Sequence, residues 1–216
     1  MAKNKKWQDD DWLLLMQAYL HRPVGLKPVY SRVMVQLALE LHIQPESLAV
    51  RMQQIAKLDK PRIERIWQTY ANSPGKLSRA VKLLRAMKGF GRADEFYDGV
   101  EINETWERDW TPLAADERLT PVVLTLVLDL YFRLTPATMV RQTPEVQELA
   151  RLVHISADDV VDILDVFQHC DPYLNRRDVT LSELLQPCQQ VWQRYGNGDP
   201  QALATLADHL KVYYLS

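Results

Sequence analysis

Apolar residues recur along this chain at the three- and four-residue spacing of amphipathic helices, and sustained apolar–polar alternation is scarce. The pattern predicts helices over residues 12–20, 31–41, 45–58, 61–70 and 77–84. Residues suited to helix starts stand at these boundaries: Ser31 as an N-cap, Pro45 in a first turn, and three aspartates at 9–11 before the first helix. We therefore expect an all-α fold with short connections.

The helical pattern is interrupted at residues 89–117 and then returns in the same order. At an offset of 112, Tyr19 falls on Tyr131, and the segment 37–43 (LALELHI) falls on 149–155 (LARLVHI). After an insertion of about thirteen residues the match resumes, with 67–72 (WQTYAN) on 192–197 (WQRYGN). The sequence predicts two tandem copies of one helical module, residues 1–88 and 118–216.

The segment between the copies, residues 89–117, is acidic and aperiodic. It carries four large aromatic residues: Phe96, Tyr97, Trp106 and Trp110. A free linker seldom exposes so many apolar groups to water. We expect this connector to pack onto a domain surface.

Each predicted copy contains a stretch typical of a helix-turn-helix, residues 37–48 and 149–160. Ala38 is small enough for a close helix crossing, and Ser156 is a good N-cap for the helix after the second turn. His42 and His154 stand at equivalent positions in the turns, which favours a shared structural role such as ending a helix. Such a helix pair is found both in DNA-binding proteins and as a structural corner.

Charge separates the two copies. Residues 1–88 hold 16 Lys and Arg against 7 Asp and Glu, a net of +9, whereas residues 89–216 hold 10 against 21, a net of −11. The candidate nucleic-acid-binding residues of the first copy are Arg51, Lys57, Arg79, Lys82 and Arg85, the last three at a three-residue step that predicts one stripe. The helix after the second turn carries Asp158, Asp159, Asp162 and Asp165 instead, and an acidic helix repels phosphates.

Two interpretations of this polarity remain open. In one, the first copy contacts double-stranded DNA, and the acidic copy mimics, regulates or recruits. In the other, the acidic copy packs against the basic one, within a chain or in a homodimer, or binds a partner protein, and the charges neutralise each other.

The run 40–52 (ELHIQPESLAVRM), followed by Leu58-Asp59, resembles the helical N-terminal module that precedes the nuclease domain in some bacterial HNH endonucleases. The resemblance covers about forty residues of each copy. It implies a DNA-associated helical module of bacterial type and nothing catalytic. The Asn-Phe that such modules carry near their exit is missing here, where Gln54-Ile55 stands close to Leu58-Asp59, and the dispersed histidines form no His-Asn-His finger.

Motifs of catalysis are missing from the sequence: it has no Gly-rich phosphate loop, Gly-x-Ser-x-Gly elbow or His-Glu-x-x-His. We expect no catalytic, cofactor-binding or metal-binding residues. Trp67 with Tyr70, and Trp192 with Tyr195, are most simply packing anchors. The insertion carries Tyr173, Arg176 and Arg177 and is a candidate contact loop, or else a surface excursion.

Neither a secretory signal nor a membrane-spanning run is evident, and Cys170 and Cys188 lie in apolar settings that predict buried, reduced thiols. We therefore expect a cytoplasmic, non-enzymatic protein without a membrane partner. Its expected role is DNA binding or regulation through the basic first repeat, and the alternative is a protein–protein adaptor or homodimer.

Overall fold

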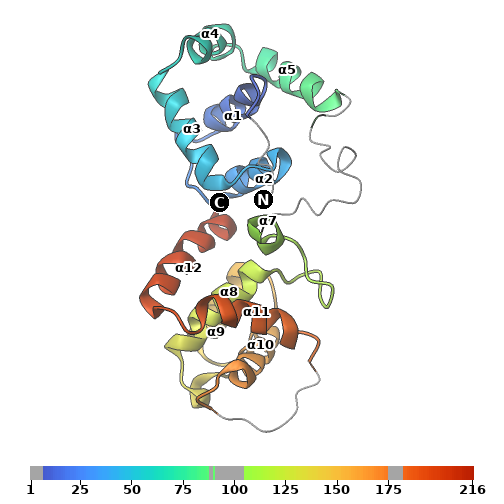
Figure 1. Cartoon of the computed structure of the whole chain (residues 1–216), viewed down its shortest axis with the longest axis vertical. Coiled ribbons are helices and arrows are strands. Elements are labelled where there is room, and N and C mark those ends of the chain that lie inside the picture. Colours follow the sequence, from blue (N-terminus) through green and yellow to red (C-terminus); the bar gives the residue numbers. More distant parts are fainter. Residues whose placement is uncertain (1–6, 88–89, 91–104, 175–181) are drawn as a thin grey trace. The chain divides into compact units, whose positions relative to one another are not determined.

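A computed structural model of the chain describes residues 7–87, 90, 105–174 and 182–216, and every regular element in these residues is helical. The all-α prediction is therefore confirmed. The chain divides into two compact units, residues 1–107 and 108–215 (Figure 1). The division between residues 107 and 108 falls inside the predicted connector, residues 89–117. It lies within the short helix α7 (Thr105–Asp109).

The first unit contains five consecutive helices: α1 (Asp11–Leu20), α2 (Arg32–Leu41), α3 (Pro45–Lys57), α4 (Pro61–Tyr70) and α5 (Pro74–Ala86). Helix α1 is the central element, since α2, α3, α4 and α5 all pack against it. Its Leu14, Leu15 and Met16 are at most 2% exposed. In Figure 1, α1 lies between α3 and α5.

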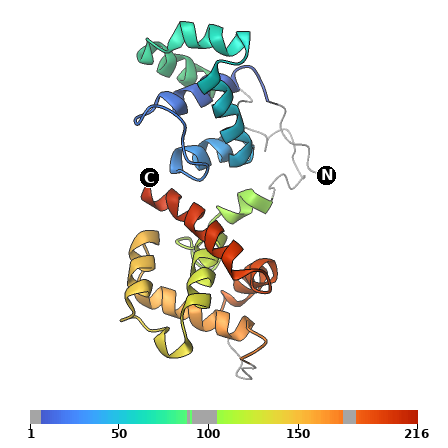
Figure 2. The same ribbon diagram turned by 90° about the vertical axis from the view of Figure 1, so that its left-hand side faces the viewer.

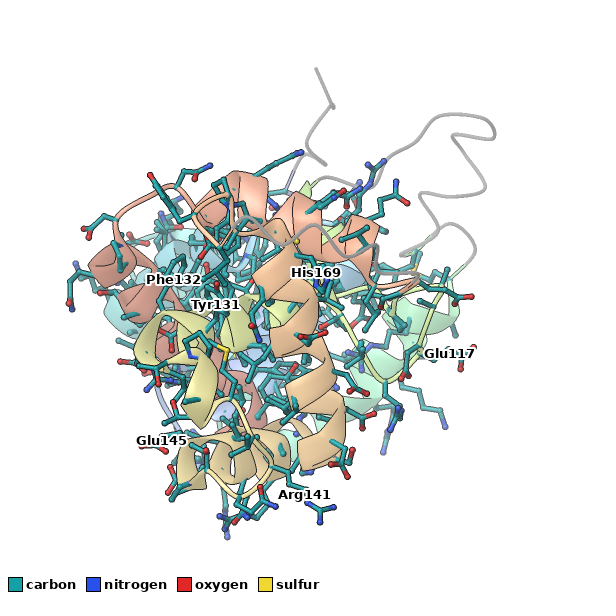
Figure 3. The ribbon with its side chains drawn as sticks, turned by 90° about the horizontal axis from the view of Figure 1, so that it is seen from below. Glu117, Tyr131, Phe132, Arg141, Glu145 and His169 are labelled. Atoms are coloured by element: carbon teal, nitrogen blue, oxygen red, sulfur yellow. The ribbon has the colours of Figure 1, made fainter. Side chains whose placement is uncertain are left out.

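The second unit contains α8 (Pro121–Arg133), a short 3-10 turn η1 (Pro136–Thr138), α9 (Pro144–Val153), α10 (Ala157–Cys170), α11 (Leu185–Tyr195) and α12 (Pro200–Leu215). Helix α8 is central here, in contact with α9, α10, α11 and α12 (Figure 2). The rings of Tyr131 and Phe132 lie next to each other at its C-terminal end (Figure 3), with centroids 5.5 Å apart. Trp192 of α11 packs on both rings and on Phe167 of α10.

A histidine with a left-handed backbone ends the helix before the turn in each unit. His42 follows α2 with φ 52° and His154 follows α9 with φ 62°. The next residue then donates its N–H backward: Ile43 to the Ala38 carbonyl at 3.0 Å, and Ile155 to the Ala150 carbonyl at 3.1 Å. This is the hydrogen bond of a Schellman C-cap, which satisfies a carbonyl that the helix end would leave free. Both histidines thus have the helix-ending position that the sequence predicts.

The N-caps of the helices that flank these turns differ. Ser156 caps α10 as predicted, because its hydroxyl accepts from the Asp159 N–H at 3.0 Å while the Asp159 carboxylate accepts from the Ser156 N–H at 2.9 Å. Ser31 stands at the N-cap of α2, but its hydroxyl donates to the Pro28 carbonyl at 2.9 Å. Pro45 opens α3 as its first residue.

Two of the four connector aromatics pack onto a domain surface, as predicted. Trp106 packs against the core of the first unit, and the Trp110 ring lies 4.7 Å from that of Tyr213 in the second. Phe96 and Tyr97 lie outside the described residues, as do Asn175, Arg176 and Arg177 of the insertion.

Candidate nucleic-acid interface

The outward face of α5 is a basic surface of the first unit. Successive residues turn by about 100° around a helix, so Arg79 lies nearly opposite the buried Leu77, Val81 and Leu84, with Lys82 beside it. Both are exposed, and in the described part of the chain no carboxylate pairs with either. No residue of α5 is Asp or Glu.

Arg85 does not continue this face. A three-residue step falls about 60° short of a full turn, so the row 79, 82, 85 winds around the helix. The side chain of Arg85 lies beside α2, where its Nε and Nη2 donate to the Glu40 carboxylate at 2.6 and 2.8 Å. The hydrogen bonds from Arg85 to Glu40 raise the pKa of Arg85. The predicted stripe is therefore reduced to Arg79 and Lys82.

Arg51 and Lys57, the other two predicted residues, lie on α3. The Arg51 guanidinium is 4.7 Å from the centre of the Trp7 ring and donates to the Ser47 carbonyl at 3.0 Å. This stacking and hydrogen bonding hold Arg51 against its own unit. Lys57 is exposed in the last turn of α3. Helices α3 and α5 do not pack closely on each other, so the five residues do not lie along one pair of adjoining helices.

The first turn of α3 is acidic on its exposed side. Glu46 is exposed there and accepts a hydrogen bond from the Tyr30 hydroxyl. Farther along, Val50 is 58% exposed and Gln53 is exposed. In a DNA-reading helix-turn-helix, the N-terminal residues of the second helix contact base edges in the major groove. The cationic residues of α3 stand away from that turn, so α3 is poorly equipped for base reading.

The corresponding surface of the second unit is acidic. On α10, the side chains of Asp158, Asp162 and Asp165 are exposed at three- and four-residue spacing. Partial burial, followed by the charges of Asp159, Asp158 and Asp165, raises the pKa of Asp162. Asp159 differs: burial alone would raise its pKa, but hydrogen bonds from Ser156 and Arg118 lower it overall. No phosphate chain would be attracted to this helix.

A groove of about 610 Å³ opens in the first unit between α1, α2 and α5. Its apolar lining includes Leu14, Leu37 and Leu77, and polar side chains such as Gln17 and Glu40 also line it. Sequence reasoning missed this groove, since it depends on how far apart α2 and α5 stand. One residue of the groove could have been suspected from the sequence. The three-residue spacing from Arg79 and Lys82 rotates Arg85 away from the outward face of α5 and toward the groove.

Other site chemistry is sparse in the residues that the structure describes. They hold no group of three or more His, Cys, Asp or Glu placed to bind a metal ion, and no helix that is both long and apolar enough to cross a bilayer. Cys188 is buried and Cys170 half-buried, and both are free thiols. Burial raises the pKa of Cys170 to about 11, and burial followed by the neighbouring Cys170 raises that of Cys188. A thiol with a raised pKa is a poor nucleophile near neutral pH.

No protein-family model matches the chain, and neither a curated protein nor a solved structure matches it significantly.

Proposed function

We propose that this protein binds double-stranded DNA without catalysis, through phosphate contacts made by the outward face of α5. The observation that carries the proposal is the exposure of Arg79 and Lys82, unopposed by any described carboxylate, on a helix that has no acidic residue. Cations placed in this way release the counterions that DNA condenses, which drives association.

The mode of contact follows from the distribution of charge. Phosphate contacts position a protein on a duplex but carry little sequence information, whereas base contacts specify the sequence. Arg79 and Lys82 lie on α5, whereas the first turn of α3, where a DNA-reading helix contacts bases, carries the acidic Glu46. We therefore expect binding that varies little with DNA sequence. The resemblance to the helical module of HNH endonucleases supports a DNA-associated role.

We further propose that the two units are copies of one module, of which one binds DNA. Positions 112 apart are buried alike: Leu14 and Leu126, Met34 and Val146, Leu48 and Val160 are all at most 2% exposed. Tyr19 and Trp67 pack edge to face at 5.9 Å and 72°, and Tyr131 and Trp192 do so at 5.7 Å and 77°. The left-handed histidines add a third parallel.

The proposal is tested by the salt dependence of binding. Fluorescence anisotropy with a labelled duplex of arbitrary sequence, from low to physiological salt, measures the slope of log affinity against log salt. We expect a clear negative slope for the unmodified chain. In the double variant Arg79→Gln, Lys82→Gln the slope should become shallower by about 1 to 2, because each lost phosphate contact removes about 0.9.

A matched variant controls for net charge. Arg141→Gln, Arg151→Gln removes two exposed cations from the second unit and should leave the slope unchanged. No binding at low salt, or equal weakening by both double variants, would overturn the proposal.

The acidic face of α10 supports a second candidate function, an adaptor or homodimer that uses opposite charges. Asp158, Asp162 and Asp165 would attract a cationic protein surface, such as α5 of another copy. This alternative predicts salt-sensitive self-association or a defined cationic partner. Light scattering that shows a monomer at every salt concentration, together with no partner, would remove it.

A further inference from the structure

We propose that the groove between α1, α2 and α5 binds a small amphiphile with an elongated apolar body and a carboxylate. The volume of about 610 Å³ falls within the range of roughly 300 to 1,000 Å³ typical of small-molecule sites. This site is separate from the outward face of α5, because neither Arg79 nor Lys82 lines it.

The floor of the groove is apolar. Leu14, Ala18, Leu37 and Leu77 line it, and each is at most 7% exposed. On α5 the lining runs from Pro74 to Arg85, a helical rise of about 16 Å. An elongated apolar floor of this kind matches a hydrocarbon chain or a narrow ring system.

The groove exists because α5 stands away from α2. In the second unit, the last helix, α12, packs on both α8 and α9, and its Lys211 lies 3.9 Å from Asp129 of α8. In the first unit, α5 packs on α1 and α4, and Arg85 reaches α2 through its ion pair with Glu40. The position 112 residues before Asp129 is Gln17, which lines the groove without charge.

The charged side chains that line the groove favour an anionic ligand over a cationic one. The guanidinium groups of Arg22 and Arg85 line the groove, against the single carboxylate of Glu40. Arg85 is already engaged by Glu40, whereas Arg22 is exposed and has no ion-pair partner in the described residues. A guanidinium binds a carboxylate through parallel hydrogen bonds. Arg22 is therefore the residue to which the ligand carboxylate would bind.

The loop that carries Arg22 is held in place before any ligand arrives. The Lys27 ammonium donates to the His21 carbonyl at 2.7 Å and also to the Pro23 carbonyl, one residue on either side of Arg22. Val24 of the same loop lines the groove and is 63% exposed, which leaves apolar surface for a ligand to cover. A loop that is already ordered loses less conformational entropy on binding.

The test is calorimetric titration of the full chain with decanoate and with decyltrimethylammonium, both kept below micelle formation. Decanoate should bind at one site, and the cation should bind at least tenfold more weakly. Arg22→Gln should weaken decanoate binding about tenfold, as expected for the loss of one charge-assisted contact, and leave the cation unaffected.

A second variant blocks the groove itself. Ser78 lines the groove and is exposed, so Ser78→Trp should fill the space and abolish binding without disturbing the core. Thr205→Trp, at an exposed position of α12, is the matched control and should bind normally; thermal melting by circular dichroism checks that both variants fold. The proposal is overturned if decanoate fails to bind, if folded Ser78→Trp binds it as tightly as the unmodified chain, or if Arg22→Gln has no effect. Capture of an acidic amphipathic peptide at this face in place of decanoate would assign the groove to a protein partner and equally overturn it.

Discussion

Helices α3 and α10 follow the same kind of turn but present opposite surfaces. A left-handed histidine and a Schellman hydrogen bond precede each helix, and its inward side is fully buried, at Leu48 and Met52 in α3 and at Val160 and Leu164 in α10. On the outward side, α3 carries Val50, Gln53 and Lys57, whereas α10 carries aspartates. The positions that build the frame agree, and the positions that meet solvent do not.

Buried and exposed positions differ in what a substitution costs the fold. A change at a buried position costs free energy wherever it occurs, since the core is close-packed. A surface charge contributes little to stability, so two similar helix pairs can carry different surface charges at little cost. Substitutions at matching positions of the two units should therefore have different effects on stability.

The largest effect is expected at the paired tryptophans. Trp192 is 7% exposed and packs on three rings, whereas Trp67 is half-buried and packs edge to face on Tyr19. Trp192→Ala should lower the free energy of unfolding of the second unit by about 3–5 kcal/mol. Trp67→Ala should cost the first unit roughly 1–2 kcal/mol, in proportion to its smaller buried area. Hydrogen exchange resolved by mass spectrometry measures both units in the intact chain.

A glycine explains part of this asymmetry. A Cβ on Gly196 would meet the Trp192 ring at 2.5 Å, so the close packing of this ring requires glycine there. The first unit has Ala71 at the matching position. Gly196→Ala should therefore loosen Trp192 and destabilise the second unit, and equal losses for Trp67→Ala and Trp192→Ala would contradict the comparison.

A smaller effect is expected at the two histidines. A left-handed backbone costs a residue with a Cβ about 1–2 kcal/mol, and glycine avoids most of that cost. His154 is exposed, so His154→Gly should stabilise the second unit by about 0.5–1 kcal/mol. His42→Gly should give no gain, because Nδ1 of His42 contacts the Glu107 carboxylate at 3.1 Å and this nearly buried carboxylate would lose that partner. Chemical denaturation measures the free energy of unfolding of both variants. Equal gains for His42→Gly and His154→Gly would show that the contact between His42 and Glu107 contributes nothing to stability.

The smallest effect is expected on α10. Asp162 has a raised pKa in the folded chain, so its ionisation at neutral pH works against folding. Asp162→Asn should stabilise the second unit by about 0.2–0.5 kcal/mol at pH 7. The gain should disappear as the pH falls through the raised pKa, because the unmodified carboxyl is then neutral too. A gain that persists in acid, measured by denaturation at several pH values, would exclude charge repulsion as its cause.

Much of the frame could be predicted from the sequence because its determinants are local. Apolar spacing fixes the helices, Pro45 and Ser156 mark helix starts, and the repeated histidine marks helix ends. The surface was less predictable. Arg85 pairs with Glu40, which lies 45 residues away, and Arg51 stacks on Trp7, so neither engagement follows from spacing along one helix. The groove depends on the separation of α2 and α5, which no local pattern encodes.

Contact between DNA and the outward face of α5 is tested most directly by the rate of lysine acetylation in the intact chain, with and without saturating duplex. Lys82 should be protected by DNA at low salt and lose that protection as salt rises. Lys211 of α12, which is held by Asp208 at 2.8 Å, should react at the same rate throughout. If Lys82 reacts equally fast when the chain is saturated with DNA, the outward face of α5 is not the DNA interface.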